Sequence, residues 1–139
     1  MSGGPPRPGT RSGSPFEEAF GFRRAVVAEG RVLVSGTAPI EPGGGCADGA
    51  EAQADRCLAI IAAALRDLGS GPGDVVRTRM YIVDAADAGA VGRAHRRAFG
   101  EARPAATMVV VAGLLDPRWR VEIEAEAVLR PPAAAAPPG

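Results

Sequence analysis

Three glutamates alternate with apolar residues near the carboxyl end of the sequence. Glu122, Glu124 and Glu126 occupy every second position of the stretch RWRVEIEAEAVLR. Because the side chains of a β-strand point alternately to its two faces, this spacing predicts a strand with a row of carboxylates on one face. Neighbouring carboxylates repel one another, so this face must be solvated, paired with basic side chains, or part of a functional site.

A second alternating stretch carries the opposite charge. In VVRTRMYIV, residues 75–83, one face presents Arg77, Arg79 and Tyr81. The other face presents Val76, Thr78, Met80 and Ile82. A basic and an acidic strand face are natural partners across a sheet. Two interpretations remain open: a solvated face whose ion pairs contribute little, or a subunit interface whose partly desolvated charges specify register.

The other reactive side chains favour structural roles. His95, the single histidine, lies four residues from both Val91 and Phe99 on the apolar stripe of an expected helix, which favours a packed, hydrogen-bonded imidazole over proton transfer. Cys57 belongs to an apolar helical pattern and is expected in the core, where it is no nucleophile. One histidine and two cysteines give no metal-ligand spacing, so we expect no metal and no cofactor.

A basic stripe, Arg93, Arg96 and Arg97, follows one helix face. Such a stripe usually means a solvated surface, and an acidic partner protein is the alternative. Over all 139 residues, 16 arginines balance 16 acidic residues. Zero net charge argues against nucleic-acid binding. With no membrane-length apolar run, no signal peptide and only two cysteines, we expect a cytoplasmic protein without a membrane partner.

One domain is expected over residues 13–130, between flexible tails at residues 1–12 and 131–139. Both tails are too poor in apolar side chains to offset the entropy of ordering. The expected strands are residues 22–28, 31–36, 75–83, 107–113 and 119–129. Glu29-Gly30 forms the two-residue turn of a hairpin between the first two strands.

Helical periodicity predicts helices over residues 50–68 and 84–99, the second capped by Asp84. The order of elements is therefore β-β-α-β-α-β-β, which is typical of an α+β protein. Right-handed crossovers place both helices on one face of a single sheet and leave the other face uncovered.

Several strings, in this order and spacing, make the sequence similar to one known family. They are VLVSGTAP, the helix that contains Gln53, LGSGPGDVVRTRMYIVD, AVGRAHRRAFG, RPAATMVVV and VEIEAEAV. Over about residues 13–130 the chain resembles the RidA/YjgF family, the reactive intermediate deaminases. The resemblance implies a chorismate-mutase-like fold assembled as a homotrimer, with the sheets facing inward and small-molecule clefts between neighbouring subunits.

The resemblance also implies a reaction. Deaminating members hydrolyse enamines and imines derived from amino acids, which releases ammonia and a keto acid. Glu122 matches the family glutamate that orients the attacking water, and an early aromatic of the family corresponds to Phe22 or Phe20. The substrate-binding residues expected on this basis are Phe22, Ser35, Gly36, Ala106, Thr107, Arg103 and His95.

One position departs from the family pattern. Ala106 stands where deaminating members carry the arginine that binds the substrate carboxylate, so the chain resembles a divergent branch that lacks this residue. Loss of one partner of a buried charge pair costs roughly 2–5 kcal/mol. Ordinary carboxylate imines should therefore bind poorly unless Arg103, Arg23 or Arg24 replaces the missing cation, and a surface position is the more usual role of each.

Three functions follow as hypotheses. The preferred one is a trimer that binds a small metabolite between subunits and hydrolyses an imine, an enamine or a related C–N bond. The second is a ligand-sensing or protein-interaction trimer without catalysis, which the missing arginine favours. The third is an endoribonuclease, against which the zero net charge counts.

Overall fold

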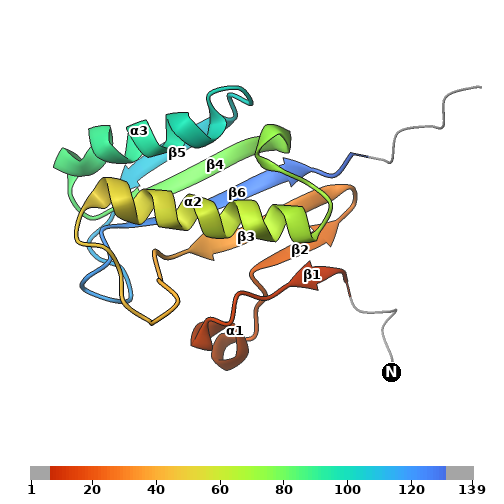
Figure 1. Ribbon diagram of the computed structural model, residues 1–139, viewed down its shortest axis with the longest axis horizontal. Helices are drawn as coiled ribbons and strands as arrows, with labels where there is room; N and C mark the ends of the chain where they lie inside the picture. The colour runs from red at the N-terminus through yellow and green to blue at the C-terminus, as the bar shows by residue number, and fades with distance from the viewer. Residues whose placement is uncertain (1–6, 131–139) are drawn as a thin grey trace, which may run out of the picture.

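The computed structural model describes residues 7–130. Its strands are β1 (Gly9–Thr10), β2 (Ala25–Ala28), β3 (Arg31–Thr37), β4 (Val75–Ile82), β5 (Ala105–Val110) and β6 (Val121–Val128). Its helices are α1 (Pro15–Phe20), α2 (Ala50–Asp67) and α3 (Ala88–Phe99), with 3₁₀ turns η1 (Pro72–Asp74) and η2 (Ala85–Asp87). The strands form one sheet in the order β1-β2-β3-β6-β4-β5 (Figure 1).

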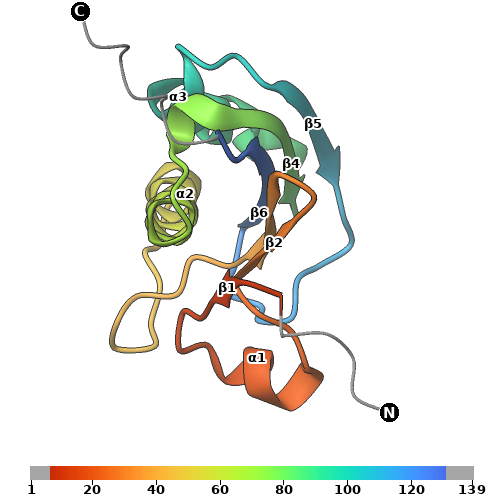
Figure 2. The same cartoon turned by 90° about the vertical axis from the view of Figure 1, so that its right-hand side faces the viewer.

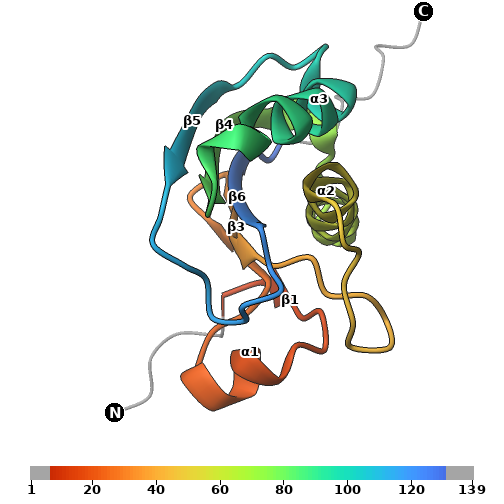
Figure 3. The same ribbon diagram turned by 90° about the vertical axis from the view of Figure 1, so that its left-hand side faces the viewer.

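The two long helices cover the same face of this sheet. Figures 2 and 3 show α2 and α3 on one side of the curved sheet and no element of the described chain over the other side. The core lies between the two layers and includes Ile61, Leu65, Ile82 and Ile123, all essentially inaccessible to solvent. The predicted α+β architecture, with both helices on one face, is confirmed.

The predicted hairpin is also confirmed. Ala28 pairs with Arg31, and the two residues between them have positive φ angles of 50° at Glu29 and 73° at Gly30. Positive φ at both central residues suits the twist of a tight two-residue hairpin. The strand β2 begins three residues later than predicted, at Ala25, because Phe22–Arg24 lead from α1 into the sheet.

The amino-terminal segment differs from the prediction. Gly9 and Thr10 pair with Val26 and Ala25, so the expected flexible tail over residues 1–12 is wrong for this part of it. The helix α1 was not predicted: Ser14 accepts a hydrogen bond from the Phe16 amide at its start. The expected tail at residues 131–139 lies outside the described residues.

Three further corrections concern local register, capping and the bounds of one strand. A register shift between Val75 and Arg77 turns Val75 into the core and leaves Val76 39% exposed. The sequence had predicted Val76 on the same face as Thr78, which is buried. Asp84 caps the 3₁₀ turn η2 rather than the helix α3 itself, since its carboxylate accepts a hydrogen bond from the Ala86 amide. The strand β5 covers residues 105–110 rather than 107–113.

Candidate functional site

The acidic row of β6 lies on the uncovered face of the sheet, beside the basic face of β4. Glu126, Glu124 and Glu122 are in register with Arg77, Arg79 and Tyr81. The Arg79 Nη1 atom lies 3.9 Å from a carboxylate oxygen of Glu124 and 3.9 Å from one of Glu126. The Tyr81 hydroxyl donates a hydrogen bond to Glu124, which raises the tyrosine pKa. Two of the three carboxylates are therefore paired within one chain.

Glu122, at the start of the row, has different surroundings. Burial raises the pKa of its carboxyl group, and the nearby Arg24 guanidinium partly opposes this rise. A Cβ atom added to Gly36 would lie only 2.8 Å from the Glu122 Oε2 atom, so any other residue at that position would displace the carboxylate. Glu122 is thus a half-buried carboxylate held against the backbone of β3.

That close approach results from a bulge in β3. Val34 pairs with Ala125 and Thr37 with Ile123, so three steps along β3 match two steps along β6. The extra residue lies at Ser35-Gly36 and changes the direction of the strand next to Glu122. Bulges of this kind occur frequently beside active sites.

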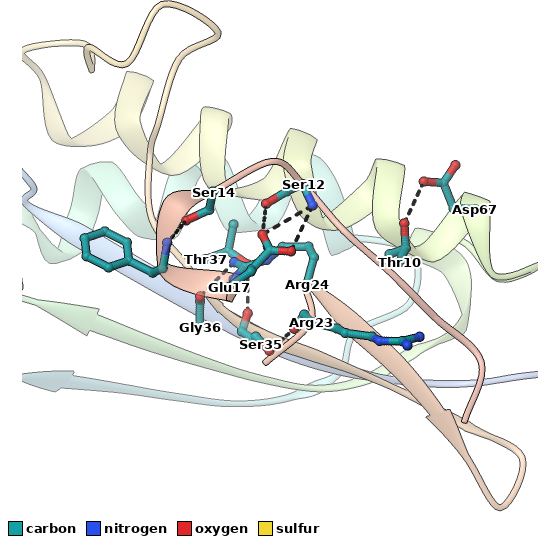
Figure 4. Close-up of polar contacts among 11 residues, drawn as sticks. Thr10, Ser12, Ser14, Glu17, Arg23, Arg24, Ser35, Gly36, Thr37 and Asp67 are labelled. Atoms are coloured by element: carbon teal, nitrogen blue, oxygen red, sulfur yellow. Dashed lines mark hydrogen bonds and ion pairs between the residues drawn. The ribbon is translucent and has the colours of Figure 1, made fainter. Parts of the chain in front are cut away.

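A buried arginine fixes the bulge (Figure 4). The Nη1 atom of Arg24 donates to the Gly36 carbonyl at 2.8 Å and to the Thr37 hydroxyl at 2.9 Å. Its Nε atom lies 3.8 Å from the Glu17 carboxylate and has no hydrogen-bond partner within residues 7–130. Burial lowers the pKa of the guanidinium, although Glu17 and Glu122 favour its charged form. The expected surface position of Arg24 is therefore wrong.

Glu17 ties the helix α1 to this arginine. The side chains of both residues are only 6% exposed. The Glu17 carboxylate also accepts hydrogen bonds from the Ser12 amide, at 3.1 Å, and from the Ser12 hydroxyl (Figure 4). The segment before β2 is consequently attached to the site through a buried ion pair.

A cavity of about 580 Å³ opens at Glu122. The end of β3 supplies Ser35, Gly36 and Thr37 to its wall. Aromatic side chains supply much of the remainder: Phe16, Phe20, Phe22 and Trp119. A pocket of this size, mostly apolar and with a few convergent polar groups, is the usual form of a small-molecule site.

Four of the expected site residues share this cavity, namely Phe22, Ser35, Gly36 and Glu122. The other four do not line it. Ala106 and Thr107 lie exposed on β5, and Arg103 lies exposed just before that strand, with a positive φ of 48°. His95 lies in the helical layer, where its Nε2 atom is 2.8 Å from the Thr78 hydroxyl and its ring packs on Phe99. Burial lowers the His95 pKa.

The remaining candidates are structural. Burial raises the pKa of the Cys57 thiol, which lies in the core as predicted. Among residues 7–130 no group of acidic, histidine or cysteine side chains could hold a metal ion, and no helix is long and apolar enough to cross a membrane. The Arg93 and Arg97 side chains of the basic stripe form ion pairs with Glu51 on the helix α2. Their acidic partner is therefore the neighbouring helix of the same chain.

Sequence reasoning missed several residues at the site, among them Phe16, Glu17 and Trp119. The pair Ser14-Pro15 was an available signal, since a serine cap followed by proline is typical of a helix start. No local pattern marks Trp119, which reaches the site through the β5–β6 connection. Figures 2 and 3 show this connection passing beside α1, and the Phe16 and Trp119 ring centroids are 6.2 Å apart.

Known proteins match this chain over most of its length. The family described as "Endoribonuclease L-PSP" matches residues 14–129. Protein SCO2049 of Streptomyces coelicolor is 39% identical over 118 residues, which are 84% of this chain and 88% of the relative.

Solved structures are similar over the same region. Rv2704 of Mycobacterium tuberculosis, described as a member of the YjgF/YER057c/UK114 family, is 41% identical with a TM-score of 0.81, over 88% of this chain and 99% of that one. A putative endoribonuclease of Thermotoga maritima is 30% identical with a TM-score of 0.75, over 88% and 93%. The expected chorismate-mutase-like fold is confirmed by these neighbours.

Proposed function

Because the chain belongs to the YjgF/RidA family, we propose that it binds a small metabolite in the cavity at Glu122 and hydrolyses an imine or enamine C–N bond there. The observation that carries this proposal is the half-buried Glu122 carboxylate, which meets the Ser35-Gly36 bulge at one end of a small-molecule cavity.

Glu122 has the chemistry that imine hydrolysis requires. Its carboxylate accepts a proton from water while the water oxygen bonds to the imine carbon and the imine nitrogen takes up a proton. Once Glu122 has passed the water proton on to the nitrogen, the resulting carbinolamine transfers its hydroxyl proton to the amino nitrogen through the same carboxylate. The C–N bond then breaks with its electron pair on nitrogen, and the products are a carbonyl compound and ammonia. A general base works best when its pKa approaches the working pH, and burial moves the pKa of Glu122 in that direction.

Arg24 supports the same reaction by fixing the position of Glu122. Its bonds to the Gly36 carbonyl and the Thr37 hydroxyl hold the bulge against which Glu122 rests. Its charge favours the ionised form of Glu122, so the carboxylate stays available as a base in a partly desolvated cavity. We treat Arg24 as a positioning residue.

The proposed assembly is a homotrimer in which the uncovered sheet faces point inward. Support comes from β5, an edge strand on which Val109 is 41% exposed and Val110 57% exposed. A neighbouring subunit would cover these side chains and close each cavity from outside. In that arrangement the expected site residues on and before β5 reach the cleft of the next subunit; they are Ala106, Thr107 and Arg103. They would therefore contact a ligand in the trimer, although they lie outside the cavity of a single chain.

Two alternatives keep the same cavity. A ligand-sensing trimer without catalysis is favoured by Ala106, because this residue puts an uncharged side chain at the family's carboxylate-binding position. An endoribonuclease is suggested by the family description and by the Thermotoga relative. Against RNA stands the zero net charge of the chain, since phosphate contacts need a basic surface.

Ammonia release separates these functions. Imines are generated in situ from a series of amino acids by an amino acid oxidase, and their decay is followed with and without the protein. We expect acceleration by the wild type and a loss of about 100-fold in Glu122→Gln, typical of removing a general base. Glu124→Gln, two residues along the same face, is the matched control. Ligand binding without any acceleration by the wild type would favour the sensing function, and cleavage of RNA would favour the third.

A further inference from the structure

We propose that the cavity selects ligands with an aromatic or bulky apolar side chain, which packs against α1 and Trp119 while the reacting group lies at Glu122. This inference rests on the proposed hydrolysis for the polar end of the ligand, and it adds the substrate class that the apolar end selects.

The distribution of aromatic side chains is the first support. The sequence holds four phenylalanines and one tryptophan, and aromatic residues make up only 4% of it. Phe16, Phe20, Phe22 and Trp119 all line the one cavity. Phe99 alone among these residues lies elsewhere, in the core of the helical layer. With Tyr81 counted as well, four of the six aromatic side chains in the sequence surround this one cavity.

The geometry of the cluster is the second support. The Phe16 and Phe20 ring centroids are 5.4 Å apart, and Phe16 meets Trp119 edge to face. Such spacings are those of favourable aromatic pairs, and an added ring extends the stack. Together the three rings form an aromatic wall, the name used below for Phe16, Phe20 and Trp119.

Exposed apolar surface at the cavity is the third support. Phe20 is 65% exposed and Leu115 is 72% exposed, although both line the cavity. Large apolar side chains left open beside a pocket are typical of a binding site. A ligand ring between them removes their surface from water and supplies the packing that the chain itself lacks.

The wall is formed before any ligand arrives. Glu17 joins α1 to Arg24 and to Ser12, and Ser14 caps the helix. A wall fixed in this way costs little conformational entropy when a ligand binds, so its apolar contact area contributes to affinity. The polar end is fixed separately, because Glu122 and the Ser35-Gly36 bulge belong to the sheet.

The two ends of the cavity therefore recognise different parts of the ligand. Glu122, with Ser35 and Gly36 beside it, faces the reacting carbon and nitrogen. The aromatic wall faces the side chain of the amino acid from which the imine derives. Small imines, such as those from alanine or serine, leave the aromatic wall in contact with water and gain no binding free energy from it.

Calorimetric titration with stable keto acids tests this inference on the full chain. Pyruvate and phenylpyruvate, the products expected from a small and an aromatic imine, share one polar end. We expect phenylpyruvate to bind about tenfold or more tightly than pyruvate, because burying a phenyl ring is worth at least that factor. Phe20→Ser should remove most of this difference by lowering the affinity for phenylpyruvate.

Val76→Ser is the matched control, since Val76 is an exposed apolar residue outside the cavity. Equal affinity of the wild type for both keto acids overturns the inference and leaves the proposed reaction standing. A third probe, 3-phenylpropionamide, lacks the keto acid group. If it binds in a Phe20-dependent manner while neither keto acid binds, the apolar specificity stands and the proposed imino acid chemistry fails.

Two further outcomes overturn the inference outright. In one, none of the three probes binds. In the other, Phe20→Ser lowers the oligomer mass measured by light scattering, which would mean that a neighbouring subunit covers Phe20.

Discussion

Gly36 and Glu122 lie so close together that no other residue fits at position 36 without moving the carboxylate. A Cβ atom there would stand 2.8 Å from the Glu122 Oε2 atom. The contact joins the bulge of β3 to the first carboxylate of β6, two elements that meet only in the folded sheet.

The first prediction follows from this contact. Gly36→Ala should displace the Glu122 carboxylate and lower imine hydrolysis about 100-fold, while unfolding free energy falls by no more than about 1 kcal/mol, since the atom displaced is a side-chain terminus. The rate of ammonia release and a urea titration measure the two effects. Gly43→Ala, where an added Cβ meets nothing within 4 Å, is the control. Full activity in Gly36→Ala would contradict a role for the Glu122 position.

The second prediction concerns pH. Because burial raises the folded-state pKa of Glu122, this carboxyl group contributes stability that is fully present below its unfolded pKa and is lost as pH rises through the folded pKa. Glu122→Gln cannot ionise and does not lose this contribution. The melting temperature of Glu122→Gln relative to wild type should therefore increase between about pH 4 and pH 7. A constant difference over this range would mean that the pKa is not raised.

The third prediction concerns the buried pair. Arg24→Met leaves the Glu17 carboxylate without its counter-charge and the bulge without its donor, and should lower unfolding free energy by about 3 kcal/mol. The double variant Glu17→Gln/Arg24→Met should recover part of that loss, because no unpaired charge stays buried. Urea titration of the wild type and the two variants measures their unfolding free energies, which should fall in the order wild type, double variant, single variant. Arg23→Met, one residue earlier, should cost less than about 1 kcal/mol.

The fourth prediction concerns assembly. Light scattering should give a mass about three times the 14.1 kDa of the chain. Glu124→Gln should weaken the trimer on dilution, because Arg79 and Tyr81 both depend on that carboxylate. Glu122→Gln should leave the mass unchanged. A stable monomer or dimer of the wild type at micromolar concentration would contradict the trimer, and equal, negligible effects of both variants would indicate a merely solvated sheet face.

Elements with a repeating pattern were predictable from sequence, and those without one were not. The helices α2 and α3 and the hairpin at Glu29-Gly30 carry periodic apolar residues or turn residues with a mechanism. The six-residue helix α1 and the two-residue strand β1 are too short to show a period. The bulge at Val75 shifted the face of Val76, because register is set by the neighbouring strand and not by the local sequence.

The site was predictable only where the family resemblance named a residue. Glu122, Ser35 and Gly36 came from matching strings, and they meet in one cavity. The burial of Arg24 had no local signal, since its partners Glu17 and Thr37 come from a helix that was not predicted and from the next strand. Residues brought together from α1, β3, β6 and the β5–β6 connection share no spacing along the chain.

The open edge of β5 has a consequence for how the protein is made. Within residues 7–130 no strand pairs with the outer side of β5, whose backbone groups lie beside the exposed Val109 and Val110 side chains. Such an edge can template the addition of a foreign strand, so a newly synthesised chain is prone to aggregation for as long as this edge stays uncovered. If the proposed trimer forms, variants that slow its assembly should accumulate as insoluble protein during expression rather than as free monomers.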